Sequence, residues 1–236
     1  MKKDRFFKFW IGLLILMLFN ILAGLVTNVS ITLSDEDKLI FQQDYSSFMG
    51  VRSGVSPEGE INIIRHIQST ILRRVPSGPG IPDYSDREPA DVLRRNTGLC
   101  YDRSRLLDKI FIWAGFETRH VYILYKPSIK GYSLPLWMAF LFPRSDSHAV
   151  TEVKTANGWL LVDSNDTWIS VNRQGEVVTA DQVWSRSKEF DAIPDYFGRP
   201  YWAIRGLYSR RGHLYRPFFP YPQLNWADFF YYYIQK

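Results

Sequence analysis

The hydrophobic pattern of the chain begins with one long apolar stretch. Residues 9–26 contain Asn20 as their one clearly polar residue. At about 1.5 Å per residue, a helix of this length extends for about 27 Å, close to the ~30 Å hydrocarbon core of a bilayer. The pattern therefore predicts a membrane-spanning helix over residues 9–27.

After this stretch the pattern changes to that of a folded domain. Residues 35–48 are polar with scattered apolar positions and predict a helix that leads away from the membrane. Residues 51–60 contain Gly, Ser and Pro and predict a loop. Residues 61–74 place apolar side chains at helical spacing, which predicts a second helix. The dense Pro and Gly positions of residues 76–83 then predict a turn.

A third helical pattern begins at Cys100 and ends before Gly115, a typical residue at a helix C-terminus. Its apolar stripe includes Leu107 and Phe111, so this face of the helix is expected to lie in the core, with Cys100 in the first turn. Strand-forming runs follow. They cover residues 119–125, 148–153 and 159–162.

The charges around the apolar stretch predict its orientation. Residues 1–8 carry four Lys or Arg and one Asp, whereas residues 35–37 are all acidic. The positive-inside rule places residues 1–8 in the cytoplasm and the domain outside. A cleaved signal peptide has a similar basic start, but its apolar region usually has about 7–15 residues before a small-x-small cleavage site. No clean Ala-x-Ala site follows here, so a retained anchor is favoured.

Composition excludes some functions. The formal net charge is +5, and residues 1–8 supply +3 of it, which leaves about +2 for the rest of the chain. This is not the strongly basic surface of a nucleic-acid-binding protein, so no nucleic-acid partner is expected. The single cysteine excludes an intramolecular disulfide and a metal site built on a CxxC pair. No metal or other cofactor is expected.

The single cysteine has surroundings that suit a nucleophile. A helix N-terminus and a neighbouring imidazolium both lower the pKa of a thiol. Cys100 is expected at a helix N-terminus, and His148 could supply the imidazolium. Asp163, at the end of the next strand, would hold the imidazole of His148 in one tautomer. Asp166 is the alternative partner of His148. The alternative for Cys100 is an inert buried thiol.

The distance between His148 and Asp163 depends on the turn that joins their strands. Residues 157–158 are Asn-Gly, which favours a two-residue hairpin turn and would place Asp163 opposite Glu152. His148 would then lie four residues away, or about 14 Å at ~3.4 Å per residue. A catalytic triad therefore requires a turn centred nearer Thr155, or a β-bulge.

Four sequence blocks, in this order, resemble the transglutaminase-like core of the papain-like superfamily over about residues 90–166. They are Gly-Leu-Cys-Tyr-Asp-Arg-Ser-Arg-Leu-Leu (98–107), Gly-Phe-Glu-Thr-Arg-His-Val (115–121), His-Ala-Val-Thr-Glu-Val (148–153) and Gly-Trp-Leu-Leu-Val-Asp (158–163). The resemblance implies an α+β fold in which the Cys-bearing helix packs on an antiparallel sheet. It also implies that Cys100 is the nucleophile, that His148 is the general base and acid, and that Asp163 orients His148. For Arg119 a structural role is expected, and Gln68 is a guess for a side-chain oxyanion donor.

The whole chain is expected to divide into five parts. These are a basic cytoplasmic flank (1–8), a transmembrane signal-anchor (9–27), a linker with a leading helix (28–60), the transglutaminase-like domain (61–204) and an Arg- and aromatic-rich C-terminal segment (205–236). Residues 127–144 look like an insertion, which is expected to be core, a lid over the site or a patch that touches the membrane, with core favoured.

The sequence thus predicts a membrane-anchored, outward-facing thiol enzyme that acts on peptide or amide bonds of protein or peptide substrates. Hydrolysis is favoured over transfer to an amine because water is always present. The alternative is a non-catalytic binding or assembly module of the cell envelope or exopolysaccharide machinery. A further alternative is a cytoplasmic enzyme whose N-terminus resembles an anchor. The C-terminal segment either packs on the domain or contacts anionic glycan or lipid headgroups, which suit Arg and aromatic side chains.

Overall fold

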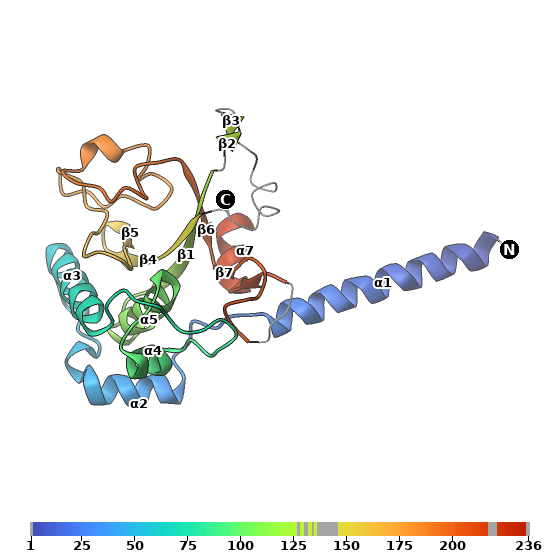
Figure 1. Ribbon diagram of the computed structural model, residues 1–236, viewed down its shortest axis with the longest axis horizontal. Helices are drawn as coiled ribbons and strands as arrows, with labels where there is room; N and C mark the ends of the chain where they lie inside the picture. Colours follow the sequence, from blue (N-terminus) through green and yellow to red (C-terminus); the bar gives the residue numbers. More distant parts are fainter. Residues whose placement is uncertain are drawn as a thin grey trace.

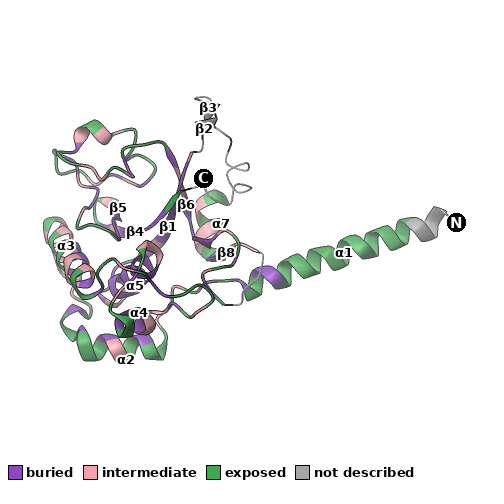
Figure 2. Ribbon diagram, viewed as in Figure 1, coloured by how far each residue is buried: buried purple, intermediate pink, exposed green. Residues whose placement is uncertain are grey.

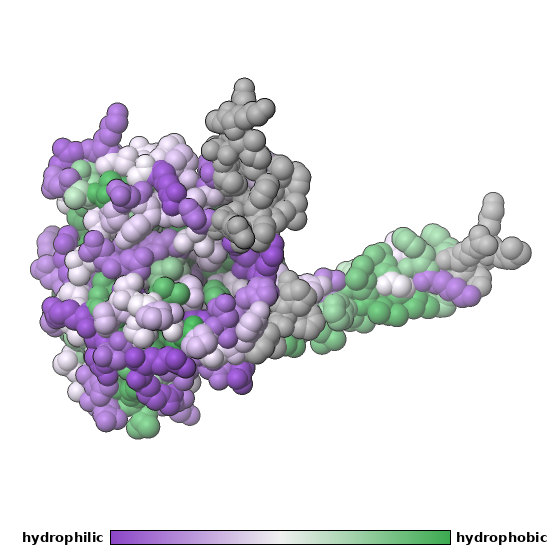
Figure 3. Space-filling model, in the orientation of Figure 1, coloured by the Kyte–Doolittle hydropathy of each residue, from purple (hydrophilic) through white to green (hydrophobic). Residues whose placement is uncertain are grey.

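The computed structural model describes residues 2–126, 128–129, 132–133, 135, 146–216 and 221–234. Helix α1 (Lys2–Val26) projects from the folded domain (Figure 1). Within the described residues, Phe6–Val26 is the one helix long and apolar enough to cross a membrane, a test that a signal sequence also passes. Its apolar side chains form a continuous exposed surface (Figure 3).

The domain end of α1 is attached to the C-terminal part of the chain, which forms strand β8 (Gln223–Leu224) and helix α7 (Trp226–Ile234). The indole Nε1 of Trp226 donates a hydrogen bond to the carbonyl of Gly24 at 2.7 Å. The backbone N–H of Val29 donates to the carbonyl of Leu224 at 2.9 Å. Figure 2 shows α1 exposed along most of its length and buried only where it meets the domain.

The helices that follow confirm most of the predicted pattern. Ser56 accepts a hydrogen bond from the N–H of Gly59 and Pro57 occupies the first helical position, so the helix predicted over residues 61–74 begins four residues earlier. The helix over residues 89–95 is too short for a periodic pattern to reveal it. The elements are α2 (Asp35–Asp44), the 3₁₀ helix η1 (Ser46–Phe48), α3 (Pro57–Arg74) and α4 (Pro89–Arg95).

Helix α5 (Cys100–Trp113) begins and ends as predicted. The carboxylate of Asp102 accepts a hydrogen bond from the N–H of Leu99 at 2.9 Å, which satisfies a backbone donor ahead of the first turn. At the other end, Gly115 adopts a φ of +91°, a conformation that favours glycine. The predicted core face of α5 is fully buried and includes Leu106, Leu107, Ile110 and Phe111.

A four-stranded antiparallel sheet packs against α5 (Figure 1). The mixed helix-and-sheet fold, with the Cys-bearing helix on an antiparallel sheet, is therefore confirmed. The opposite face of the sheet is covered by residues 163–200, which have little regular structure. The strand order is β5-β4-β1-β6, with β1 (Thr118–Tyr125), β4 (Ser147–Thr155), β5 (Gly158–Val162) and β6 (Tyr201–Arg205).

Three shorter strands and a second 3₁₀ helix complete the described elements. They are β2 (Ser128–Ile129), β3 (Tyr132–Ser133), η2 (Ser187–Glu189) and β7 (Leu207–Ser209), which pairs with β8. Most of residues 127–144, the insertion for which three roles were considered, lie outside the described residues.

The expected Asn-Gly turn between β4 and β5 is wrong by one residue. Thr155 pairs with Gly158, so the two loop residues are Ala156 and Asn157. A type I′ turn centred on Asn157 and Gly158 would need positive φ at both, and Asn157 does not have it. Gly158 adopts a φ of +118° immediately after the turn instead. Gly158 therefore supplies the positive φ at the start of β5, and it does not occupy the centre of the turn.

This register shift changes which residues face one another across the hairpin. The observed pairing ends with Thr151 opposite Val162. One further step places Asp163 opposite Val150, only two residues from His148. The turn is thus centred nearer Thr155, as a contact between His148 and Asp163 requires.

A buried charge cluster ties β6 to the rest of the sheet. The guanidinium of Arg205 donates to Glu152 at 3.1 Å and to Asp181 at 2.8 Å. Arg119 Nε donates to the other oxygen of Glu152 at 2.7 Å. Arg119 thus makes a structural contact, as expected, and Arg205 lies inside the protein rather than on a surface that could meet glycan or lipid.

Candidate active site

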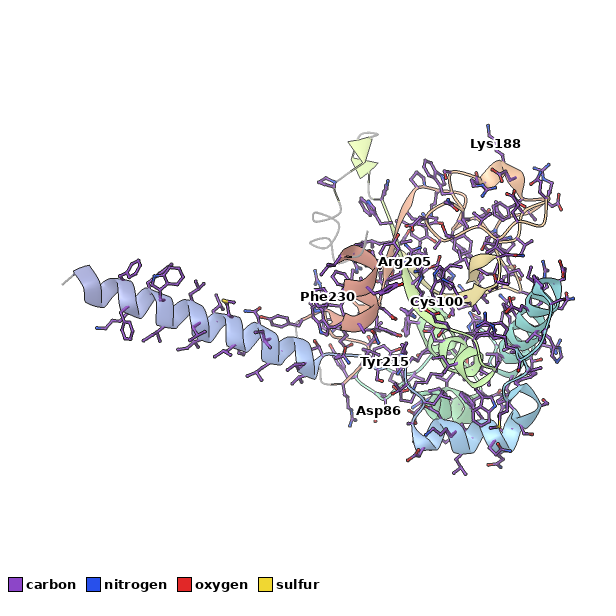
Figure 4. All side chains as sticks on the ribbon, turned by 180° about the vertical axis from the view of Figure 1, so that it is seen from behind. Asp86, Cys100, Lys188, Arg205, Tyr215 and Phe230 are labelled. Carbon is purple, nitrogen blue, oxygen red and sulfur yellow. The ribbon has the colours of Figure 1, made fainter. Side chains whose placement is uncertain are left out.

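Cys100 is the first residue of α5 and its thiol is partly exposed (Figure 4). The His148 side chain and the backbone N–H groups of Tyr101 and Ala149 lie near its sulfur and lower the pKa of the thiol. Burial alone would raise the pKa of Cys100. The hydrogen bond to His148 and the charge of its imidazolium outweigh burial, so the pKa of the thiol is lowered from its ordinary value.

His148 and Asp163 form a buried pair. The imidazole Nε2 lies 2.7 Å from Asp163 Oδ1. His148 is 4% exposed and Asp163 is fully buried. Because Nε2 is bonded to Asp163, Nδ1 is the ring nitrogen left to face Cys100.

Both neighbours of His148 favour its charged form. Burial opposes the imidazolium, but the hydrogen bonds to Asp163 and Cys100 and the charges of both groups raise the pKa of His148 to about 9. The lowered pKa of Cys100 and the raised pKa of His148 both favour the thiolate–imidazolium pair over the neutral pair. The two groups titrate as a coupled pair rather than separately.

The Asp163 carboxylate is fixed by the loop that follows β5. Its Oδ1 accepts a hydrogen bond from the N–H of Asn165 at 3.0 Å, and its Oδ2 accepts one from the N–H of Asp166 at 3.2 Å. The side chain of Asp166, the alternative partner, instead accepts from the N–H of Thr167 at 2.7 Å. The structure therefore pairs His148 with Asp163 and not with Asp166.

Gln68 supports this loop from α3. Its Nε2 lies 2.8 Å from the carbonyl oxygen of Asp163, and 2.9 Å from the carbonyl oxygens of both Asp166 and Trp168. Three carbonyls thus occupy the amide donors of Gln68, so the guess that Gln68 is an oxyanion donor is wrong. Its contact with the loop makes it a positioning residue for Asp163.

Two aromatic residues beside His148 were missed in the sequence. The ring of Tyr196 lies 4.5 Å from the imidazole, and its hydroxyl donates a hydrogen bond to Asp163 Oδ2. Phe197 is fully buried, with its ring 6.0 Å from the imidazole. Both lie in the irregular segment after residue 180, where no periodic pattern distinguishes a site residue from a loop residue.

A cavity of about 230 Å³ opens beside the cysteine. Its walls come from α5, from β1 and β4, and from the segment that follows β7. The residues that line it are Cys100, Tyr101, Tyr122, Ser147, Ala149, Ser209, Arg210, Arg211, His213 and Leu214. A substrate group of modest size can therefore reach the thiol from this side. Among the described residues, no group of three or more His, Cys, Asp or Glu is arranged to hold a metal ion.

Comparison with known proteins bears on the family. Residues 51–164 match the family model of the transglutaminase-like superfamily. This region is a transglutaminase-like domain. The match begins before the resemblance seen in the sequence blocks and includes α3, the helix that carries Gln68.

The other comparisons add little. Among solved structures, the domain is similar to a "putative protease" from Parabacteroides distasonis at 18% identity and a TM-score of 0.36. The similarity covers 58% of this chain and 24% of that one. At this distance the likeness carries no argument about fold or activity. A comparison with the curated proteins finds no match.

Proposed function

We propose that this protein is a membrane-anchored thiol enzyme that acts on peptide or amide bonds through Cys100, His148 and Asp163, with its papain-like domain on the outer side of the membrane. The connected series of thiol, imidazole and buried carboxylate supports this proposal most directly. Such a series supplies a nucleophile, a proton carrier and a group that orients the carrier.

The first half of the reaction forms a thioester. The Cys100 thiolate attacks the carbonyl carbon of the substrate, and the carbonyl oxygen takes up the negative charge. Backbone N–H groups of the first turn of α5 have no acceptor within the helix and are available to this oxyanion. The His148 imidazolium then gives its proton to the leaving amine as the carbon–nitrogen bond breaks.

The second half regenerates the enzyme. A water molecule gives a proton to the now neutral His148 as its oxygen attacks the thioester carbon. The carbon–sulfur bond breaks, the carboxylic acid leaves, and the thiolate–imidazolium pair is restored. An amine in place of water would give a new amide bond by the same steps. Hydrolysis is proposed as the main reaction because water is always present.

The location follows from α1 and the charges that flank it. Residues 1–8 would remain in the cytoplasm, α1 would be retained as the anchor, and the domain would face the cell envelope. Protein or peptide substrates of the envelope are therefore proposed.

The proposal is tested by alkylation of Cys100 with iodoacetamide at pH 7, on the full chain in a neutral detergent. A free thiol of pKa ~8.5 is about 3% thiolate at this pH, so a lowered pKa is expected to make Cys100 react about tenfold faster than the thiol of the unfolded chain. His148→Ala should remove this advantage. His66→Ala, a change on the exposed face of α3, should not. A slow thiol that is insensitive to His148→Ala would indicate a non-catalytic binding module.

A further inference from the structure

One wall of the Cys100 cavity is basic. Two of the residues that line the cavity, Arg210 and Arg211, are arginines, and none of the lining residues is acidic. Arg211 is exposed and forms no ion pair with any described residue. By contrast, Arg216 in the same segment lies 3.7 Å from Asp86. The charge of Arg211 at the cavity is therefore not neutralised by a described residue, whereas Arg216 has an acidic neighbour.

Hydrogen bonds to Ser209 and Arg87 hold the basic segment, residues 209–214, in place. The hydroxyl of Ser209 accepts a hydrogen bond from the N–H of His213 at 3.1 Å, which closes the turn that carries the two arginines. Arg87 Nε donates to the carbonyl of Leu214 at 2.7 Å. The same guanidinium binds the buried carboxylate of Asp102, in the first turn of α5. One buried arginine thus fixes the basic segment to the helix that starts with the cysteine.

Tyr84 makes a second set of contacts with this segment, through His213. The Tyr84 hydroxyl shares a hydrogen bond with His213 Nδ1 at 2.5 Å, and the backbone N–H of Tyr84 donates to the carbonyl of His213 at 3.3 Å. Tyr84 comes from the Pro- and Gly-rich turn before α4. The arginines are thus displayed on a braced turn, and a braced cationic group loses little conformational entropy when it binds an anion.

We infer that the Cys100 cavity selects acidic peptides, in which a carboxylate close to the reactive carbonyl is bound by Arg211. Arginine suits this role because its planar guanidinium binds a carboxylate through two parallel hydrogen bonds. The positive N-terminus of α5 adds to the same field. This inference rests on the proposed function, since it names the substrate class of that site.

Two alkylating reagents of nearly the same shape test whether the Cys100 cavity favours an anion. In both, the Cys100 thiolate forms a sulfur–carbon bond as the carbon–iodine bond breaks and iodide leaves, but iodoacetate is an anion and iodoacetamide is neutral. The ratio of their rates measures how far the cavity favours an anion. We expect Arg211→Glu to lower this ratio by about threefold or more at low salt, and Arg211→Gln by less. Arg65→Glu, an exposed change on α3 that is not among the residues lining the cavity, should leave the ratio unchanged.

The two proposals fail in different ways. If Cys100 of the unaltered chain reacts with iodoacetamide no faster than an unfolded thiol, the proposed function is wrong. If Cys100 is reactive but the ratio is the same in Arg211→Glu as in Arg65→Glu, only the inference about acidic substrates is wrong.

Protection of Cys100 from alkylation tests whether the bound carboxylate belongs to a peptide or to a sugar. N-acetyl-aspartate amide and N-acetyl-asparagine amide differ only in the charge of the side chain, and glucuronate offers a carboxylate on a sugar. We expect the aspartyl compound to protect Cys100 from iodoacetamide better than the other two, and Arg211→Glu to abolish the difference. Equal protection by the aspartyl and asparaginyl compounds, or stronger protection by glucuronate, would overturn the assignment to acidic peptides.

Discussion

Asp163 is a fully buried carboxylate with four hydrogen-bond donors around it. They are His148 Nε2, the Tyr196 hydroxyl and the N–H groups of Asn165 and Asp166. A buried charge is tolerated when its oxygens are satisfied in this way. The charge in turn stabilises the imidazolium of His148, which is why the pKa of His148 is raised to about 9 rather than lowered by burial.

The pH dependence of thiol reactivity should change when this charge is removed. Asp163→Asn keeps a hydrogen-bonding side chain but loses the negative charge, so the raised pKa of His148 should fall. In the unaltered chain the imidazolium is lost only as the pH rises through about 9. Because the imidazolium lowers the pKa of Cys100, we therefore expect the onset of thiolate reactivity to move to higher pH in Asp163→Asn, by at least about one pH unit.

The measurement is the rate of alkylation by iodoacetamide between pH 4 and pH 10. Asp166→Asn is the matched control, because among the described residues its side chain is bonded to the adjacent Thr167 and not to His148. An Asp163→Asn profile that coincides with that of Asp166→Asn would contradict a role for Asp163 in setting the charge of His148.

At the scale of elements, the sequence was informative where one pattern decides the structure. The stripe that includes Leu107 and Phe111, together with Gly115, defined α5, and so placed Cys100 at a helix N-terminus. The runs rich in β-formers predicted β1, β4 and β5. Such periodicity depends only on which side chains face the core, so it can be read without knowing the neighbours.

The remaining features depended on contacts between distant segments. The Asn-Gly pair indicated a hairpin turn, but the turn formed one residue earlier, with Gly158 after it. Tyr196 reaches His148 from a segment without regular structure. Almost a hundred residues separate Gln68 from the loop that it contacts. The sequence does not indicate which carbonyl groups a helical glutamine will bind over such a separation.

The contact between α3 and the loop after β5 gives a second prediction. Gln68→Met keeps the length of the side chain but removes its donors from three carbonyls. We expect the free energy of unfolding to fall by about 1–3 kcal/mol, because buried carbonyls lose their partner. Reactivity of Cys100 should also fall, since the loop holds Asp163 against His148.

Urea unfolding, followed by tryptophan fluorescence, measures the first effect, and iodoacetamide labelling measures the second. Gln43→Met makes the same chemical change on the exposed side of α2. If Gln68→Met behaved like Gln43→Met in both measurements, Gln68 would not be a positioning residue.

At the scale of the whole molecule, helix α1, the proposed anchor, and the domain are one connected structure. Residues at the end of α1 bond to the C-terminal part of the chain through Trp226 and Leu224. The domain is therefore expected to sit at a fixed position against the bilayer instead of on a free tether. The side of the membrane on which it sits decides which substrates it can meet.

The single cysteine makes this sidedness directly testable. Cys100→Ser gives a chain without cysteine, into which one reporter can be introduced. Lys188 lies on the domain, far from α1 (Figure 4), and Lys3 precedes the apolar stretch. With a charged maleimide that does not cross the membrane in question, Lys188→Cys should be labelled in intact cells. Lys3→Cys should be labelled only after the membrane is permeabilised, because the positive-inside rule places it in the cytoplasm. The reverse pattern would place the domain in the cytoplasm, and recovery of the full chain in the soluble fraction would contradict an anchor.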